Sequence, residues 1–229
     1  MTKFLLILYF HYTHFMEERL VENKDWIILL LGSIFILLAI VRAKFPRRFR
    51  EFILLPITNK YFSIEGRSNE VTHPFSVLLF LVQALSFSLF ICLLIPIFEV
   101  SLENSPMLFL QVFTGYTGLV LTKFYVEKLI AHIVNIEKVV QEYLYEKLSY
   151  LNLISIVLFI TNLIFYFVYL PNTATLLIIL LFFVFLYAIA LLSSIKKNTP
   201  LILQNFFYFI LYLCALEFAP YIILYKLVV

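Results

Sequence analysis

Six long apolar stretches occupy most of the 229-residue chain. A spanning helix needs about 20 consecutive, mostly apolar residues to cross a hydrocarbon core about 30 Å thick. The stretches are continuously apolar, whereas the strands of a membrane barrel alternate between apolar and polar residues. The sequence therefore predicts an all-α fold, a polytopic transmembrane helical bundle with six spans, over residues 26–41, 74–98, 107–125, 151–170, 173–194 and 201–227.

The composition agrees with this class, because 63% of the residues are hydrophobic and only 14% are charged. A soluble domain has about 45–50% apolar and about 25% charged residues. The net charge of +3 comes mainly from basic residues in the links between apolar stretches. It therefore does not indicate a nucleic-acid partner, and the expected surroundings are a lipid bilayer and other membrane proteins.

The positions of Lys and Arg predict how the chain is threaded, because cytoplasmic loops are enriched in these residues. Thirteen of the 17 basic residues fall in links that lie on one side of a six-span arrangement. These links are cytoplasmic elements at 42–73 and 123–150, and both termini then lie on the opposite side of the membrane. Residues 1–25 form a lead-in to a membrane domain at 26–229, and translation from Met1 and translation from Met16 both remain open.

The first cytoplasmic element contains a basic and aromatic stretch at 45–56. Such a stretch is typical of the headgroup boundary, where arginines meet lipid phosphates and apolar side chains dip into the acyl region. We expect Phe49, Phe52 and Ile53 to face the acyl chains. A positive anchor and a docking surface for a lipid or partner are both consistent with the arginines, which are Arg47, Arg48 and Arg50.

The second cytoplasmic element, 123–150, has no Pro or Gly, and its apolar residues recur at helical spacing. We expect an amphipathic helix that extends the third span and turns near Ser149 into the fourth. Its polar face is a candidate docking surface and includes Lys128, Lys138 and Glu142. A helix that packs on its own loops or on the bilayer surface is the alternative.

The third span carries a row of small residues that is suited to close helix packing, formed by Gly115 and Gly118 with neighbouring threonines. At its cytoplasmic mouth, Lys123 and Glu127 lie one turn apart, which is a spacing that permits an ion pair. Cys92 lies inside the second span, where the expected role of a cysteine is that of a small apolar packing residue.

Ionisable residues inside a span are costly and are candidates for function. Glu217 lies within the sixth span, three residues before Pro220, which is expected to kink the helix. Candidate partners at comparable depth are Thr114, Thr117 and Asn162. Three roles are open for Glu217: a protonated structural link between helices, a contact with a partner protein, or a proton or cation site in a transport path.

Enzyme signatures are missing from the sequence. It has no HExxH, GxSxG, paired Asp-rich motif or Cys/His cluster, and its four glycines do not form a phosphate-binding loop. We therefore expect no catalytic residues, no metal and no cofactor.

Four stretches taken in order carry a resemblance to a known family: FPRRFREFILLPITNKYF at 45–62, EKLIA at 127–131 with NIE at 135–137, KLSYLN at 147–152, and FYFILYLCALEFAPY at 207–221. The chain resembles a Bacteroidota family of multi-span inner-membrane proteins that is classed only as a domain of unknown function. The resemblance begins at about Asp25. It implies the inner membrane of a bacterium with two membranes, and it supplies no catalytic residue. Together with the threading predicted from Lys and Arg, an inner-membrane location puts both termini in the periplasm.

These features favour a non-enzymatic inner-membrane subunit or assembly factor of a cell-envelope complex, in secretion or motility. The alternative is a small proton-linked or lipid-handling transporter that uses Glu217. A homo-oligomer is a further form that the association could take.

Overall fold

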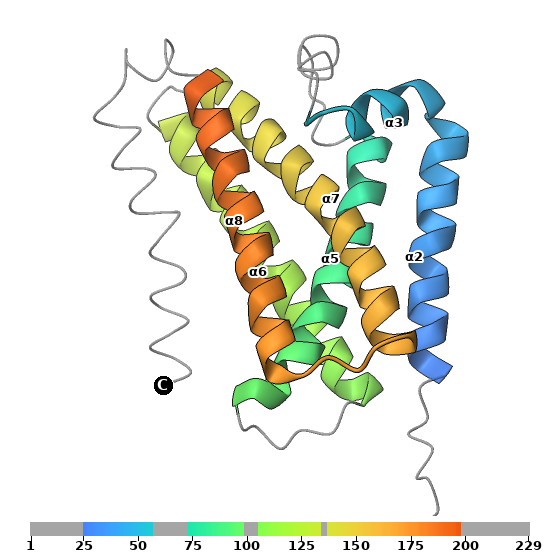
Figure 1. Cartoon of the computed structure of the whole chain (residues 1–229). Coiled ribbons are helices and arrows are strands. Elements are labelled where there is room, and N and C mark those ends of the chain that lie inside the picture. The colour runs from blue at the N-terminus through green and yellow to red at the C-terminus, as the bar shows by residue number, and fades with distance from the viewer. Residues whose placement is uncertain (1–24, 57–72, 99–104, 134–136, 198–229) are drawn as a thin grey trace, which may run out of the picture.

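A computed structural model describes residues 25–56, 73–98, 105–133 and 137–197, and the secondary structure in these ranges is entirely helical (Figure 1). The sixth expected span, 201–227, lies outside the described residues. The elements are α2 (Asp25–Lys44), α3 (Pro46–Ile53), α5 (Pro74–Leu94), the short 3-10 helix η2 (Ile95–Phe98), α6 (Pro106–Ile133), α7 (Glu137–Phe167) and α8 (Thr173–Lys197).

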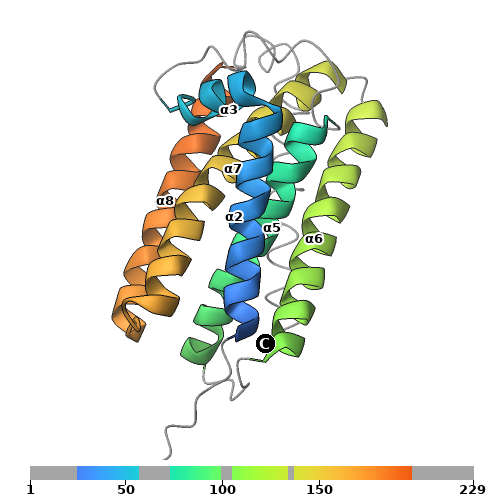
Figure 2. The same ribbon diagram turned by 90° about the vertical axis from the view of Figure 1, so that its right-hand side faces the viewer.

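The five long helices run up and down beside one another (Figures 1 and 2). Helix α5 packs against α2, α6 and α7, and α7 in turn packs against α8. In its most apolar window, 56% of the residues of the α5 span are buried, compared with 11% for α6. Helix α5 is therefore the central helix of the described bundle, and α6 lies at its edge.

The helix starts follow local signals in the sequence. At α5, the His73 Nδ1 atom accepts a hydrogen bond from the Phe75 amide at 3.1 Å, and Pro74 occupies the first turn. The Ser105 hydroxyl accepts from the Leu108 amide at 3.2 Å at the start of α6. Polar side chains that accept from the first free amides, and proline at the first helical position, are typical helix starts.

All five long helices are long and apolar enough to cross a membrane, so the expected helical membrane bundle is confirmed at this level. Within the described ranges, every Lys and Arg lies toward one end of the bundle, where α2, α6 and α8 end and α3, α5 and α7 begin (Figure 1). Asp25 begins α2 at the opposite end. The bundle is therefore strongly polarised along its length, and we refer to the Lys- and Arg-rich end as the basic end.

The expected boundary between the third and fourth helices was wrong. Helix α6 ends at Ile133, α7 begins at Glu137, and α7 continues without a break through Ser149 into the fourth span. The amphipathic element at 123–150 is thus divided between two antiparallel helices. A contact between Glu127 and Lys147 fits this arrangement, because residues 20 positions apart would be separated by about 30 Å in one continuous helix.

The expectation for Phe52 was also wrong. Its side chain is fully buried in a cluster with Val41, Leu55, Phe75, Leu79 and Tyr145, so it packs on the protein and not on acyl chains. Its ring meets the Phe75 ring edge-on, with the centroids 5.9 Å apart. Because the large aromatic side chain of Phe52 is buried against the bundle, it holds α3 in contact with α2 and α7. Phe49 is half-buried and packs against the same cluster, whereas Ile53 is 47% exposed.

Candidate functional site

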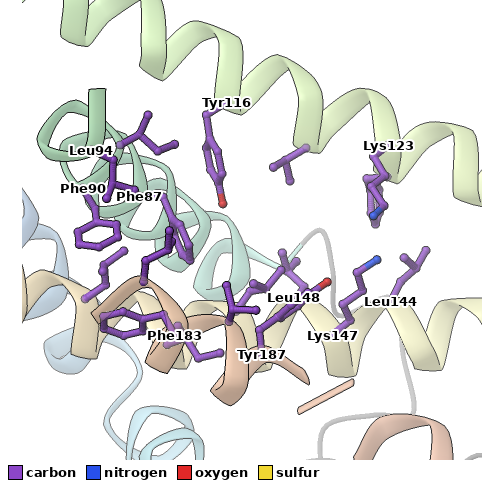
Figure 3. Close-up of a pocket in the computed structure, with 18 of the residues that line it drawn as sticks. Phe87, Phe90, Leu94, Tyr116, Lys123, Leu144, Lys147, Leu148, Phe183 and Tyr187 are labelled. Carbon is purple, nitrogen blue, oxygen red and sulfur yellow. The ribbon is translucent and has the colours of Figure 1, made fainter. Parts of the chain in front are cut away.

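A partly open cavity of about 300 Å³ lies between α5, α6, α7 and α8, and Figure 3 shows the side chains that line it. Most of its lining is apolar and aromatic. Phe90, Leu94 and Phe183 lie toward one end, whereas Lys123 and Lys147 point toward each other at the other end (Figure 3). Concave apolar sites with a few converging polar groups are typical ligand-binding sites, so this cavity is the candidate functional site.

The charged end of the cavity is built on a buried ion pair. The Lys147 Nζ atom of α7 donates a hydrogen bond to Oε1 of Glu127 on α6 at 3.2 Å, and their side chains are only 8% and 2% exposed. The same ammonium lies 5.7 Å from the centroid of the Tyr143 ring, within reach of a cation–π attraction. A buried charge needs such compensation because it has lost its hydration.

The ion pair lies far along α6 from the start of that helix. Glu127 follows the first residue of α6, Pro106, by 21 residues, which corresponds to about 32 Å along the helix axis. Lys123 lies about 26 Å along the same axis. A helix that starts at one boundary of a hydrocarbon core about 30 Å thick would bring these side chains close to the other boundary.

The candidate residues of the expected spans that the structure describes do not line this cavity. Asn162 is fully buried, and its Nδ2 atom donates to the backbone oxygen of Ser86 at 2.8 Å, which links α7 to α5. Thr114 is exposed and donates to the backbone oxygen of Leu110 in its own helix. Thr117 is half-buried. Glu217 and Pro220 lie outside the described residues.

The candidate docking residues lie near the basic end. Arg47 and Arg50 are exposed on α3, Arg48 is half-buried, Lys128 is exposed on α6, and Glu142 is half-buried on α7. The guanidinium of Arg47 lies 3.5 Å from Glu51 one turn later, in an exposed contact. The side chain of Lys138 is outside the described part of the structure.

Helix α5 receives further polar links. The Gln83 amide donates to the Tyr116 hydroxyl of α6 at 2.8 Å, and the Tyr166 hydroxyl of α7 donates to the backbone oxygen of Leu89 at 3.2 Å. Such bonds hold membrane helices together where burial of apolar surface cannot. Cys92 is buried beside these links in an apolar cluster, which confirms its expected packing role.

The sequence reasoning missed the partnership of Glu127 with Lys147, because it placed both residues on one cytoplasmic helix. The sequence of 140–150 did carry a signal that these side chains face inward. Glu146 and Lys147 interrupt a series of apolar residues there, and the structure buries both of them. Within the described ranges, no group of three or more His, Cys, Asp and Glu residues is placed to hold a metal ion.

The fold and its apolar surface define a polytopic helical protein of the membrane type. The chain belongs to the family described as Domain of unknown function (DUF4271), whose model matches residues 27–228. No curated protein and no solved structure matches the chain.

Proposed function

We propose that the protein is a non-enzymatic subunit or assembly factor of a cell-envelope complex, such as one for secretion or motility, in the inner membrane of a Bacteroidota bacterium. The observation that carries the proposal is the length of the α6–α7 hairpin. The two helices have 28 and 31 residues, or about 42 and 46 Å, against a core of about 30 Å. The helices therefore exceed the core by about 12 and about 16 Å, and their basic ends offer a surface to partners.

That surface is polar and exposed at the end of the hairpin. Lys128 and His132 are exposed on α6, and Glu137 and Gln141 are exposed on α7. The His132 ring and the Glu137 carboxylate contact each other across the break between the helices. We call these four residues the hairpin tip. Acid, base and amide side chains gathered there suit a partner with a mixed polar surface.

The proposed topology has six spans, with the basic end in the cytoplasm and both termini in the periplasm. The polarisation of the described helices supports it, because Lys and Arg are enriched on the cytoplasmic side of membrane proteins. The elements at 42–73 and 123–150 are then cytoplasmic, although the second of them lies partly within the bundle.

The test uses a tagged full-length copy expressed at its native level and extracted in mild detergent. Mass spectrometry identifies the proteins that co-purify with it. The expected result is a defined set of companions that is lost when the hairpin tip carries Lys128→Glu together with Gln141→Lys. Lys44→Glu at the end of α2 is the control for an exposed charge reversal at the same end.

A lone monomer, or companions that survive both tip substitutions, would overturn the subunit proposal. A homodimer alone would also overturn it in its heteromeric form. The scan leaves out Glu127, Glu146 and Lys147, which are buried, because their replacement would disturb folding.

A second candidate function is lipid handling or proton-linked transport, and the apolar cavity with its charged end favours it. The role of Glu217 in this candidate is tested by Glu217→Gln. Loss of transport with normal abundance and detergent stability would support a transport site. A protein that is merely unstable would instead support a structural link.

A further inference from the structure

We propose that the last apolar stretch of the chain, 201–227, packs as a helix into the groove between α6 and α8 and covers the open side of the cavity. The inference rests on the proposed six-span topology, but not on the identity of any partner. Three observations support it: the gap between α6 and α8, the shortness of the link that follows α8, and a shielded hydroxyl group on α6.

The groove lies between two helices that both line the cavity but are not closely packed on each other. Helix α5 packs against α6 and α7, and α7 packs against α8, whereas α6 and α8 are not a closely packed pair among the described helices. These two helices lie on opposite sides of the bundle in Figure 2. Val120 of α6 and Val184 of α8 both line the cavity, and Val184 is still 55% exposed. The cavity is therefore open between α6 and α8.

A helix is favoured in such a groove by van der Waals packing. Acyl chains are as apolar as leucine, so exposed apolar side chains alone do not drive helices together in a membrane. A groove with a wall on each side, however, gives a helix close contact with two neighbours. Among the described residues, only 11% of the most apolar window of α6 and 17% of that of α8 are buried, compared with 56% for α5. Both walls therefore have surface with which to contact another segment.

The link after α8 restricts where the last stretch can lie. Helix α8 ends at Lys197, and the apolar stretch begins at Leu201. The four peptide units between these residues span at most about 14 Å, and packed helices lie about 8–10 Å apart. The stretch therefore starts at the basic end beside α8. Because α7 occupies one side of α8, the groove toward α6 and the outer face of α8 remain as alternatives.

A hydroxyl group on α6 favours the groove over the outer face of α8. The hydroxyl oxygen of Thr117 is shielded from solvent, yet no described residue forms a hydrogen bond with it. Thr117 lies about two turns before Phe124, which lines the cavity, so both side chains lie on one face of α6. A polar group in the membrane core is costly without a hydrogen-bond partner. A helix in the groove can supply one, whereas a helix on the outer face of α8 cannot reach Thr117.

Glu217 is at the right depth to be that partner. Thr117 precedes the last residue of α6, Ile133, by 16 residues, and Glu217 follows Leu201 by the same number. At a rise of about 1.5 Å per residue, each lies about 24 Å from the basic end of its helix. A protonated carboxyl group both donates and accepts hydrogen bonds, as a hydroxyl group does. The proposed packing thus brings two polar groups of the membrane core to the same level.

The test is disulfide cross-linking of the full-length protein in membranes, in a background with Cys92→Ala and Cys214→Ala. Each residue of 210–217 is replaced in turn by Cys, because this range covers two helical turns at about 14–24 Å from the basic end. Each replacement is combined with Val120→Cys or Val184→Cys, which lie at the cavity about 20 Å from the basic ends of α6 and α8.

The matched controls are Thr122→Cys on α6 and Phe182→Cys on α8. Each is exposed and lies two residues from the corresponding cavity position, so it points to the opposite face of the same helix at nearly the same depth. Only variants whose melting temperature in detergent matches that of the cysteine-free background are compared, so that loss of a link can be separated from loss of fold.

We expect links within one chain between 210–217 and both cavity positions, Val120→Cys and Val184→Cys, that recur at every third or fourth residue. The links to α6 and to α8 should fall on different residues of the stretch, because a helix in the groove contacts its two walls with two faces. Both controls should stay at background yield, since they point away from the groove.

Three results would overturn the proposal. Links to Phe182→Cys in place of Val184→Cys would put the stretch on the outer face of α8. Links found only at twice the mass of the chain would mean that a second copy fills the groove. Absence of links to both cavity positions in a folded protein would mean that lipid or a partner fills it.

Failure of the topology can be told apart from failure of the packing. A membrane-impermeant maleimide added from the periplasmic side labels Val229→Cys only if the stretch crosses the membrane. Labelling without the expected links would leave the six-span topology standing and reject the packing in the groove.

Discussion

The ammonium of Lys147 lies 3.2 Å from the carboxylate of Glu127, across the gap between α7 and α6, and both side chains are buried. The pair joins two helices whose boundary carries no Pro or Gly. The pair matters to the fold mainly because each charge offsets the desolvation penalty of the other. Either charge buried alone would destabilise the protein.

Removal of one partner should therefore destabilise the protein more than removal of both. We expect Lys147→Met to lower the stability by about 3–5 kcal/mol, and the double variant Glu127→Leu/Lys147→Met to recover most of the loss. A double-mutant cycle on unfolding free energies in detergent would measure this coupling. Losses that simply add would contradict a buried, mutually compensated pair.

The link between α7 and α5 should contribute less, because hydrogen bonds within membranes are modest. We expect Asn162→Leu to cost about 0.6–1.7 kcal/mol of unfolding free energy through the lost bond to the Ser86 oxygen. Thr161→Val is the matched control, since among the described residues that hydroxyl bonds to the backbone of its own helix at Val157. Equal effects of the two variants would mean that the link between helices does not stabilise the bundle.

The anchoring of α3 should depend on one side chain. We expect Phe52→Ala to lower the stability by about 3–5 kcal/mol through loss of apolar contacts and the cavity left behind. Ile53→Ala, at a residue that is 47% exposed, should have a much smaller effect. Limited proteolysis of 45–56 in membrane vesicles provides the second measurement, and only Phe52→Ala should accelerate cleavage there.

The small residues of α6 have space around them. A Cβ atom placed at Gly118 meets no atom of the described residues within 4 Å, and the same holds for Gly32 of α2. We expect Gly118→Ala and Gly32→Ala to keep or slightly raise the melting temperature, because alanine favours helix by up to about 1 kcal/mol over glycine. A loss of stability confined to Gly118→Ala would show that another segment or a partner packs against this face.

Much of the helical arrangement could be predicted from the apolar runs alone. The starts at Pro74 and Thr173 agree with prediction, because a polar residue or a proline marks each one. The break between α6 and α7 could not be predicted in this way, because 123–150 contains no Pro or Gly and its apolar residues keep a helical spacing throughout. The contact between Glu127 and Lys147, which fits the break, joins side chains that are distant in sequence.

The candidate site was harder to predict for the same reason. Asn162 stood out because it is polar inside an apolar run, and the structure buries it in a link between helices. Lys147 did not stand out, because a lysine in a helix with many charged residues is expected to lie on a solvated face. Only the neighbouring helix shows that it faces inward, toward Glu127 and the cavity.

The 20-residue separation of Glu127 and Lys147 also has a consequence for biogenesis. A ribosome that adds 5–20 residues each second synthesises Lys147 about 1–4 s after Glu127. Glu127 and Lys147 cannot pair until the second helix has emerged from the ribosome, so insertion is most favourable when α6 and α7 enter the membrane together as a helical hairpin. The two opposite charges then compensate each other as they leave water.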